Sequence, residues 1–392
     1  MERLKVLFLT NWYPTREEPV KAVWVREQAK AVRLYDEVRV LHCAGPDPTL
    51  RQRWRGEPET DESLRDGVPT YRVWYRPLPL PYASYFLYLW AICRAFRRLV
   101  DEGFRPDVLH VHVYDAGGPA VLLGKLHRIP VVVSEQFSSF PRRLLGRLDL
   151  AKARLAFRCA HVVIPVSRAL QQAIEHYGIH ARFQVIPNVA DTTLFSPPPY
   201  LRRDTNPKRI LFVGQLVPVK GLPDLLRALS HLGRKREDWH LDIVGDGAAR
   251  AEYERLAVDL QLGEKVTFHG LKTKREVADF MRRADFFVLP SLCETFSAPA
   301  IEALATGTPI LATRCGGPEE FISKEVGSLV PPGDADALCQ GLDSMLDNLR
   351  LYSHERIARY ARDRFSPELV GAQLHAVYQS LTPARPAGSV PR

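Results

Sequence analysis

Two glutamates eight residues apart, Glu294 and Glu302, are the residues of this sequence best placed to do chemistry. Glu294 follows an apolar run that predicts a buried strand over 285–289, and Glu302 lies in a helix predicted over 299–305. Ser297 is a favourable N-cap for that helix, whose first-turn amides favour an anion such as phosphate. Together these groups suit a sugar nucleotide, since carboxylates accept hydrogen bonds from sugar hydroxyls. Such a pair also arises by chance, as one solvated and one ordinary helical glutamate.

Glycines follow two of the strands predicted in the second half of the chain. Gly214 comes after a strand predicted over 209–213, and Gly245 and Gly247 come after one predicted over 240–244. Glycine lets the backbone approach a nucleotide closely, although a bare Gly-x-Gly is a weak signal. The sequence has no Gly-x4-Gly-Lys-Ser/Thr motif, which argues against a phosphate-loop ATPase. It also has no convincing paired-aspartate metal motif.

Two histidines alternate on a strand predicted over 108–112 in the first half of the chain. His110 and His112 therefore point to one face of that strand. A lone histidine is usually structural, but His112 stands nearer the carboxyl end, where it would reach a ligand. Asp115 follows, at the opening of a helix predicted over 116–127.

Apolar runs alternate with helix-like stretches through both halves, which predicts an α/β protein with a parallel sheet in each half. Ligands of such sheets gather at the carboxyl ends of the strands. A proline-rich run after residue 195 places a domain boundary at 190/191, so we expect domains at 1–190 and 191–365, a crossing helix at 366–381 and a disordered tail at 382–392. The remaining expected strands are 5–10, 38–42, 130–134, 161–166, 265–268 and 309–312, and the remaining expected helices are 23–33, 84–101, 142–159 and 167–177.

Residues 284–319 resemble the donor-site signature of glycosyltransferase family 4, also called glycosyl transferases group 1. Glu294 and Glu302 match the Glu-x7-Glu motif of that signature. Residues 214–221 resemble the family's Gly-Arg-Leu-x-x-x-Lys-Gly loop, and residues 107–112 resemble its Asp-x-x-His-x-His segment. With the weaker matches at 185–195 and 268–271, the resemblance covers nearly the whole chain.

The resemblance implies the GT-B fold, with two Rossmann-like domains facing across a cleft and a C-terminal helix crossing back to the first. It also implies retaining transfer of a sugar from a nucleotide diphosphate to an acceptor hydroxyl, without metal or cofactor. Lys220 would offset charge on the diphosphate, Glu302 would hold the ribose, and Glu294 and His112 would orient the transferred sugar. The implied donor-binding residues are Gly214, Gln215, Lys220, Gly245, Gly247, Leu271, Glu294, Phe296, Ser297 and Glu302.

The sequence departs from the family pattern at three places. Gln215 stands where the family has arginine, Gln136 stands where a histidine is common, and the first loop, residues 11–22, lacks the family's glycine pair. Two other functions stay open. One is a nucleotide-sugar epimerase of similar architecture, and the other is a non-catalytic relative that only binds a nucleotide or a partner, which Gln215 and the glycine-free first loop favour. The acceptor is the least readable part, and bacterial surface polysaccharide or glycolipid assembly is the default expectation.

Composition and charge indicate in which cellular compartment the protein works. The chain has 392 residues, 46% of them apolar and 25% charged, as in soluble globular proteins, and its six cysteines are scattered like free thiols of a reducing cytosol. We expect no secretory signal and no membrane span. The net charge of +9 falls entirely within residues 1–190, and its densest part is 142–158. This cluster is either a solvated face or a surface for anionic lipid.

We therefore expect a cytoplasmic protein, with a peripheral position on the inner face of the membrane as a further expectation. The aromatic start of the helix expected at 84–101 fits core packing or an interfacial helix. No nucleic-acid recognition motif is present. The expected partners are a nucleotide sugar and a saccharide or lipid-linked acceptor.

Overall fold

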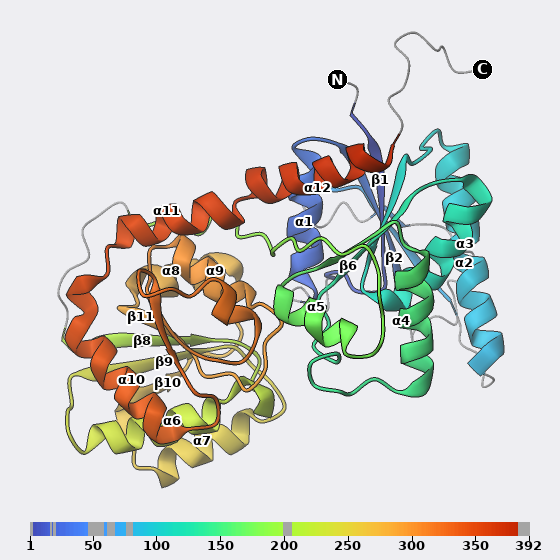
Figure 1. Ribbon diagram of the computed structural model, residues 1–392. Helices are drawn as coiled ribbons and strands as arrows, with labels where there is room; N and C mark the ends of the chain where they lie inside the picture. Colours follow the sequence, from blue (N-terminus) through green and yellow to red (C-terminus); the bar gives the residue numbers. More distant parts are fainter. Residues whose placement is uncertain are drawn as a thin grey trace. The chain divides into compact units, whose positions relative to one another are not determined.

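The structure is a computed structural model, and it describes residues 3–15, 18, 21–45, 59–60, 67–75, 81–198 and 206–382. The chain forms two compact units (Figure 1). Unit 1 comprises residues 1–166, 170–189 and 367–392, and unit 2 comprises residues 167–169 and 190–366.

Unit 1 is built on a sheet in which six strands run parallel and one short edge strand runs antiparallel. Its order is β3-β4-β2-β1-β5-β6-β7, so the direction of winding reverses between β1 and β5. Ligand sites of open α/β sheets form at such a reversal, beyond the carboxyl ends of the strands. The strands are β1 (Lys5–Thr10), β2 (Glu37–Gly45), β3 (Glu59–Thr60), β4 (Thr70–Trp74), β5 (Val108–His112), β6 (Val131–Glu135) and β7 (Val162–Pro165).

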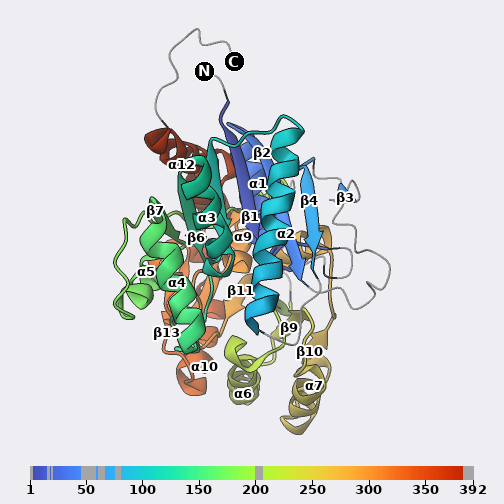
Figure 2. The same cartoon turned by 90° about the vertical axis from the view of Figure 1, so that its right-hand side faces the viewer.

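Helices cover both faces of the unit 1 sheet. On one face, α1 (Val23–Arg33) packs against α12 (Pro367–Leu381), which brings the end of the chain back onto the first unit. The predicted crossing helix is thus confirmed. On the other face, α2 (Pro81–Asp101), α3 (Gly117–His127) and α4 (Arg147–Cys159) lie side by side (Figure 2). The short helix α5 (Arg168–Glu175) follows β7.

Unit 2 repeats the plan with a sheet of six parallel strands in the order β10-β9-β8-β11-β12-β13. Its winding reverses between β8 and β11. The strands are β8 (Lys208–Val213), β9 (Trp239–Val244), β10 (Val266–Phe268), β11 (Phe286–Leu289), β12 (Ile310–Thr313) and β13 (Gly327–Val330). The helices are α6 (Leu222–Gly233), α7 (Arg250–Asp259), α8 (Lys274–Arg283), α9 (Ala298–Ala305), α10 (Ala335–Asn348) and α11 (His354–Phe365).

The predicted α/β class and the ten predicted strands are confirmed, but β3, β4 and β13 were missed. In β4 the buried Arg72 interrupts the apolar pattern that predicts a strand. Its burial is possible because its guanidinium donates hydrogen bonds to His42 at 2.7 Å and to the Pro14 carbonyl at 2.8 Å. Two helix starts were also wrong. The helix expected from Ser84 begins at Pro81, and the one expected from residue 142 begins at Arg147.

Two further expectations concern the tail and the membrane. The predicted disordered tail lies almost wholly outside the described residues, which end at 382. Among the helices of the described residues, none combines the length and the apolar character that a bilayer span requires.

Candidate functional site

Two of the three charged residues singled out in the second half, Lys220 and Glu294, meet in unit 2 although they lie 74 residues apart in the chain. Lys220 ends the turn that follows β8, and its Nζ donates to Glu294 Oε1 at 2.6 Å. Ser291 Oγ donates to the same carboxylate oxygen at 2.8 Å. Glu294 is buried and Lys220 is partly exposed. The lysine therefore reaches solvent while its charge is held in place by the carboxylate.

Glu294 is fixed by its backbone as well as by its side chain. Its N–H donates to the Cys315 carbonyl at 3.0 Å, and its carbonyl accepts from Gly317 N–H at 3.0 Å. This bridge joins the loop after β11 to the loop after β12. A Cβ on Gly317 would lie 2.1 Å from the Thr295 carbonyl oxygen, so only glycine permits the approach. The carboxylate is thus preorganised by two loops at the carboxyl edge of the sheet.

Ser297 lies at the N-cap position of α9, but it does not cap the helix as predicted. Its side chain makes no capping hydrogen bond, and its Oγ is buried without a hydrogen-bond partner among the described residues. Its φ of 93° lies in a region that L-residues rarely adopt. Strain and an unsatisfied hydroxyl at one residue are typical of a functional site, where a ligand completes the hydrogen bonding.

The two glycines after β9, Gly245 and Gly247, have a structural reason that the sequence did not reveal. A Cβ on Gly245, whose φ is 136°, would lie 1.9 Å from the Gly214 carbonyl oxygen. A Cβ on Gly247 would lie 2.5 Å from the Leu216 carbonyl oxygen. Backbone packing between two loops therefore accounts for both glycines. Their expected contact with a nucleotide stays a prediction.

The other predicted donor residues of unit 2 differ in how far they are exposed to solvent. Glu302 is buried on α9, with Lys274 Nζ at 3.6 Å from its Oε1. The Phe296 ring is buried against Phe321, with ring centroids 4.9 Å apart. Gln215 and Leu271 are both exposed.

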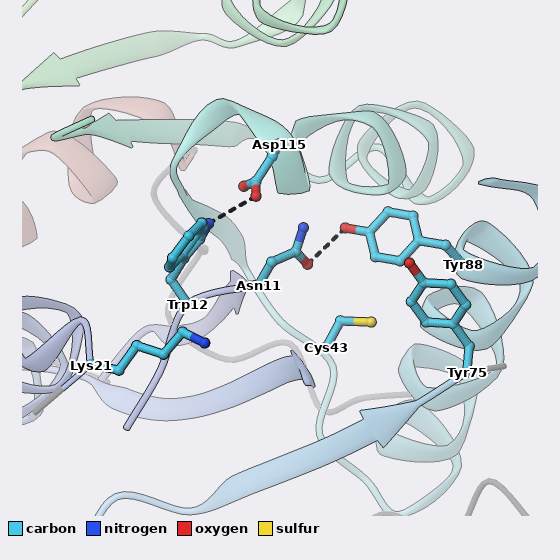
Figure 3. A pocket seen from close by; sticks show the side chains of 7 residues that line it. All are labelled: Asn11, Trp12, Lys21, Cys43, Tyr75, Tyr88 and Asp115. Atoms are coloured by element: carbon cyan, nitrogen blue, oxygen red, sulfur yellow. Dashed lines mark hydrogen bonds between the residues drawn. The ribbon is translucent and has the colours of Figure 1, made fainter. Parts of the chain in front are cut away.

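Unit 1 contains a cavity of about 200 Å³ beyond the carboxyl ends of β1, β2, β4 and β5 (Figure 3). Trp12 Nε1 donates to Asp115 Oδ2 at 2.9 Å, and Tyr88 OH donates to Asn11 Oδ1 at 3.0 Å. Aromatic rings and hydrogen-bonding side chains together suit a sugar or another polyol, which offers both apolar ring faces and hydroxyls. The lining residues are Asn11, Trp12, Lys21, Cys43, Tyr75, Tyr88 and Asp115.

Two buried carboxyl groups that follow or end strands of unit 1 have raised pKa values, and one of them, Asp115, lines this cavity. Burial raises the pKa of Asp115 to about 6, against the lowering effect of hydrogen bonds from Trp12 and Asn11. Burial also raises the pKa of Glu135 to about 7, although its carboxylate accepts backbone N–H bonds from Phe137, Tyr114 and Gln136. Asp115 can therefore bind or release a proton near neutral pH.

His112 lies at the end of β5, where the sequence placed it, and its ring is buried. Burial, with a smaller effect of His110, holds its pKa well below the usual range, so it is neutral. Neither ring nitrogen has a hydrogen-bond partner among the described residues. His110 is different, because Tyr378 OH lies 2.6 Å from its Nδ1 and Ser134 Oγ lies 2.7 Å from its Nε2. His110 is thus structural, and His112 has unused hydrogen-bonding capacity.

The sequence reasoning missed most of the cavity. Asn11 and Trp12 were noted only as part of a loop without glycine, and Asp115 only as the start of a helix. A signal was available, since each of the three follows a predicted strand of the same sheet. Tyr88 had no such signal, because it comes from the interior of α2.

Comparison with known families matches both units. The model of "Glycosyl transferases group 1" matches residues 199–364, and the model of "Glycosyl transferase 4-like domain" matches residues 22–189.

Individual relatives span almost the whole chain. A Bacillus subtilis protein provisionally named teichuronic acid biosynthesis glycosyltransferase TuaC is 27% identical, over 97% of this chain and 99% of its own. Glycogen synthase of Mycobacterium tuberculosis is 29% identical over 87% of this chain and 84% of its own. Among solved structures, HepE of Anabaena in complex with UDP-glucose has a TM-score of 0.75 and 21% identity, with 96% of this chain and 100% of that chain covered. That likeness concerns the fold.

Proposed function

The chain belongs to the glycosyl transferases group 1 and has the GT-B fold, and on this premise we propose that it is a retaining enzyme that uses a nucleotide-diphosphate sugar. The sugar is transferred to a hydroxyl of a saccharide or lipid-linked acceptor. Relatives named for teichuronic acid biosynthesis and for glycogen synthesis support assembly of a polysaccharide or glycolipid.

The observation that carries this proposal is the Lys220–Glu294 pair beside the strained Ser297 in unit 2. A diphosphate that meets Lys220 replaces one anionic partner with another, so the lysine charge is never left unpaired. The Ser297 hydroxyl and the first-turn amides of α9 then donate to phosphate or sugar oxygens. The freed Glu294 accepts from a hydroxyl of the transferred sugar. Glu302 accepts from the ribose.

In the proposed reaction, the bond between the anomeric carbon and the diphosphate oxygen breaks, and its electron pair leaves with the diphosphate. The acceptor oxygen bonds to the anomeric carbon on the same face, and its proton passes to the departing phosphate. Lys220 stabilises the charge that develops on the leaving group. Because a lysine and backbone amides do this work, we propose that turnover needs no metal and survives EDTA. Loss of turnover on chelation, restored by Mg²⁺, would contradict this.

We place the acceptor in unit 1, at the cavity that Asp115 lines. Asp115 accepts a hydrogen bond from an acceptor hydroxyl when ionised, and the aromatic rings of Trp12 and Tyr75 contact the apolar face of a sugar. His112 keeps the proposed role of orienting the transferred sugar, which its two unpartnered ring nitrogens support. The other donor residues, Gly214, Gln215, Gly245, Gly247, Leu271 and Phe296, contribute backbone or surface contacts to the nucleotide. We further propose that the protein works at the cytoplasmic side of a membrane.

A single experiment separates this function from its alternatives. The protein is screened for thermal stabilisation by a panel of nucleotide sugars, and the best donor, labelled in its sugar, is incubated with and without saccharide acceptors. We expect label in a new glycoside, and its NMR spectrum should show the anomeric configuration of the donor. An isomerised donor formed without acceptor would identify an epimerase. Stabilisation without any product would identify a binding protein.

A further inference from the structure

Exposed apolar side chains gather on one helical layer of unit 1, formed by α2, α3 and α4. Of the twelve large apolar residues that are exposed in the described parts of the chain, seven lie on this layer or in the turn before α4. Phe86 and Leu148 are each 70% exposed, and Trp90 is 56% exposed. The seven are Phe86, Trp90, Leu122, Leu126, Leu144, Leu148 and Leu155.

The three helices are held in one layer by close contacts at the start of α3. A Cβ on Gly118 would lie 2.1 Å from the Tyr85 hydroxyl of α2, and a Cβ on Gly117 would lie 2.3 Å from Ala156 Cβ of α4. Phe86 and Leu155 are the neighbours of these two contact residues. They are exposed while the contact residues face inward. Because α2, α3 and α4 lie side by side (Figure 2), the exposed residues of these helices belong to one layer of unit 1.

Helix α4 shows the pattern of an interfacial helix. Ala153, Ala156 and Phe157 are buried, and Leu148 and Leu155 project from the opposite side of the helix. Exposed basic residues flank the two leucines: Arg147, Arg154 and Arg158 along one side and Lys152 along the other. An apolar stripe flanked by arginine and lysine is typical of helices that lie in a membrane interface.

Charge on this layer is strongly one-sided. Exposed arginines precede α4 at Arg142 and Arg143, and on α2 the Arg94 guanidinium lies 5.3 Å from the centre of the Trp90 ring. The opposing acidic groups are few. Asp149 lies 3.4 Å from Lys152 Nζ, and Asp101 and Glu102 stand at the far end of α2. The whole excess charge of the chain, +9, falls within residues 1–190.

We propose that this layer, with the turn at 138–146, docks on a bilayer surface that contains anionic phospholipid. Phe86, Trp90 and Leu148 enter the boundary between headgroups and acyl chains. The arginines that surround them contact lipid phosphates. A bilayer that contains anionic lipid accounts for both the basic and the apolar residues of the layer. A solvated basic face would need no exposed Trp, Phe and Leu, and an acidic protein surface has no apolar interior into which they could insert. The inference is independent of the donor site in unit 2.

The test is sedimentation of the full chain with vesicles of phosphatidylcholine that contain about one third phosphatidylglycerol. We expect binding at low salt that weakens as salt rises, and no binding to vesicles of phosphatidylcholine alone. Changing Arg142, Arg143, Arg147 and Lys152 to Gln should lower the partition coefficient about fivefold for each residue. Arg154 is left intact because its guanidinium donates to the Tyr177 carbonyl at 3.1 Å.

A matched control removes the same charge from unit 2, by changing the exposed Arg255, Arg275, Arg356 and Arg359 to Gln. This variant should bind vesicles like the wild type. Equal loss in both variants, or no binding of the wild type to anionic vesicles, would overturn the proposal. Nucleotide-sugar stabilisation of both variants shows that they are folded and separates this outcome from failure of the proposed function.

The depth to which side chains insert into the bilayer distinguishes the proposed docking from simple adsorption of a basic protein. Brominated acyl chains should quench part of the tryptophan fluorescence of the bound wild type, and the Trp90→Phe variant should lose that part while still sedimenting. The Leu148→Ser, Leu155→Ser double variant should bind more weakly at every salt concentration, whereas Leu351→Ser, at an exposed position of unit 2, should not. Quenching that is unchanged in Trp90→Phe would overturn the assignment of this face.

Discussion

The two units differ in the charged groups that lie at the carboxyl edges of their very similar sheets. In unit 2, Lys220 and Glu294 neutralise each other at 2.6 Å and are held by two loops. In unit 1, Asp115 is buried with hydrogen bonds from neutral groups, and His112 is buried and neutral. A common fold therefore presents a lysine–glutamate ion pair in one unit and, in the other, a cavity lined mainly by neutral hydrogen-bonding and aromatic groups.

The difference shows what each unit can bind at low cost. An ion pair can exchange one charged partner for another, so unit 2 is suited to a diphosphate. Five of the seven residues that line the unit 1 cavity are neutral types, and covering these with an uncharged ligand costs little, so unit 1 is suited to hydroxyls. The assignment of donor to unit 2 and acceptor to unit 1 follows from this contrast, and the variants below test it.

The largest effect is expected at Lys220. Lys220→Ala should lower kcat/KM about a hundredfold to a thousandfold, because it removes a charge directed at the leaving diphosphate. The measurement is steady-state kinetics with the donor found by screening. Gln215→Ala is the control from the same loop, and it should lower kcat/KM only a few fold because a neutral contact is about half as strong as a charge-assisted one. Equal losses would contradict the role given to Lys220.

The next effect is a pH dependence in unit 1. Because the folded-state pKa of Asp115, about 6, lies above its ordinary value of 3.8, the folded state binds this proton more tightly than the unfolded state. The resulting stability is present below about pH 4 and is lost as pH rises through 6, by about 3 kcal/mol. Urea unfolding should therefore show the wild type losing stability relative to Asp115→Asn between pH 4 and 7. Parallel profiles would show that Asp115 is ionised normally.

Two buried tyrosines, one in the core of each unit, allow the stability contribution of a buried hydroxyl to be compared between the units. Tyr378→Phe removes the hydroxyl that bonds His110 at 2.6 Å in unit 1 and should lower the free energy of unfolding by about 1–3 kcal/mol. Tyr253 is equally buried in unit 2, but its hydroxyl has no hydrogen-bond partner among the described residues. Tyr253→Phe should therefore be neutral or slightly stabilising. Denaturant unfolding of both variants gives the comparison, and equal losses would refute it.

The smallest effect is expected at Ser297, where a substitution should change donor binding and the free energy of unfolding in opposite directions. Ser297→Gly relieves a φ of 93° and should raise the free energy of unfolding by about 1 kcal/mol, whereas Ser297→Ala should not. Both variants lose the hydroxyl, so both should bind the donor more weakly. Calorimetry and donor titration measure the two quantities. A glycine variant that is less stable than the wild type would show that the serine is unstrained.

Much of the fold could be read from local patterns. Short apolar runs separated by helix-like stretches predicted ten strands correctly, since buried parallel strands need continuous apolar sequence. The strands that were missed break that rule, as Arg72 does in β4. Two helix starts were wrong because local residue types do not fix them: α2 begins at Pro81, before Ser84, and α4 begins at Arg147, after residue 142.

The sequence by itself also determined the residue types of the proposed donor site, because Lys220, Glu294 and Glu302 stand at motif spacings that follow strands. It could not determine that Lys220 and Glu294 bind each other, since 74 residues separate them. Tertiary structure alone decided three further points: that Ser297 is strained and not a cap, that Gly245 is required by a neighbouring loop, and that the cavity of unit 1 joins Asn11 to Asp115. The physical reason is the same in each case. Local sequence fixes what a residue can do, but only the packing of distant loops fixes which groups it meets and whether water reaches them.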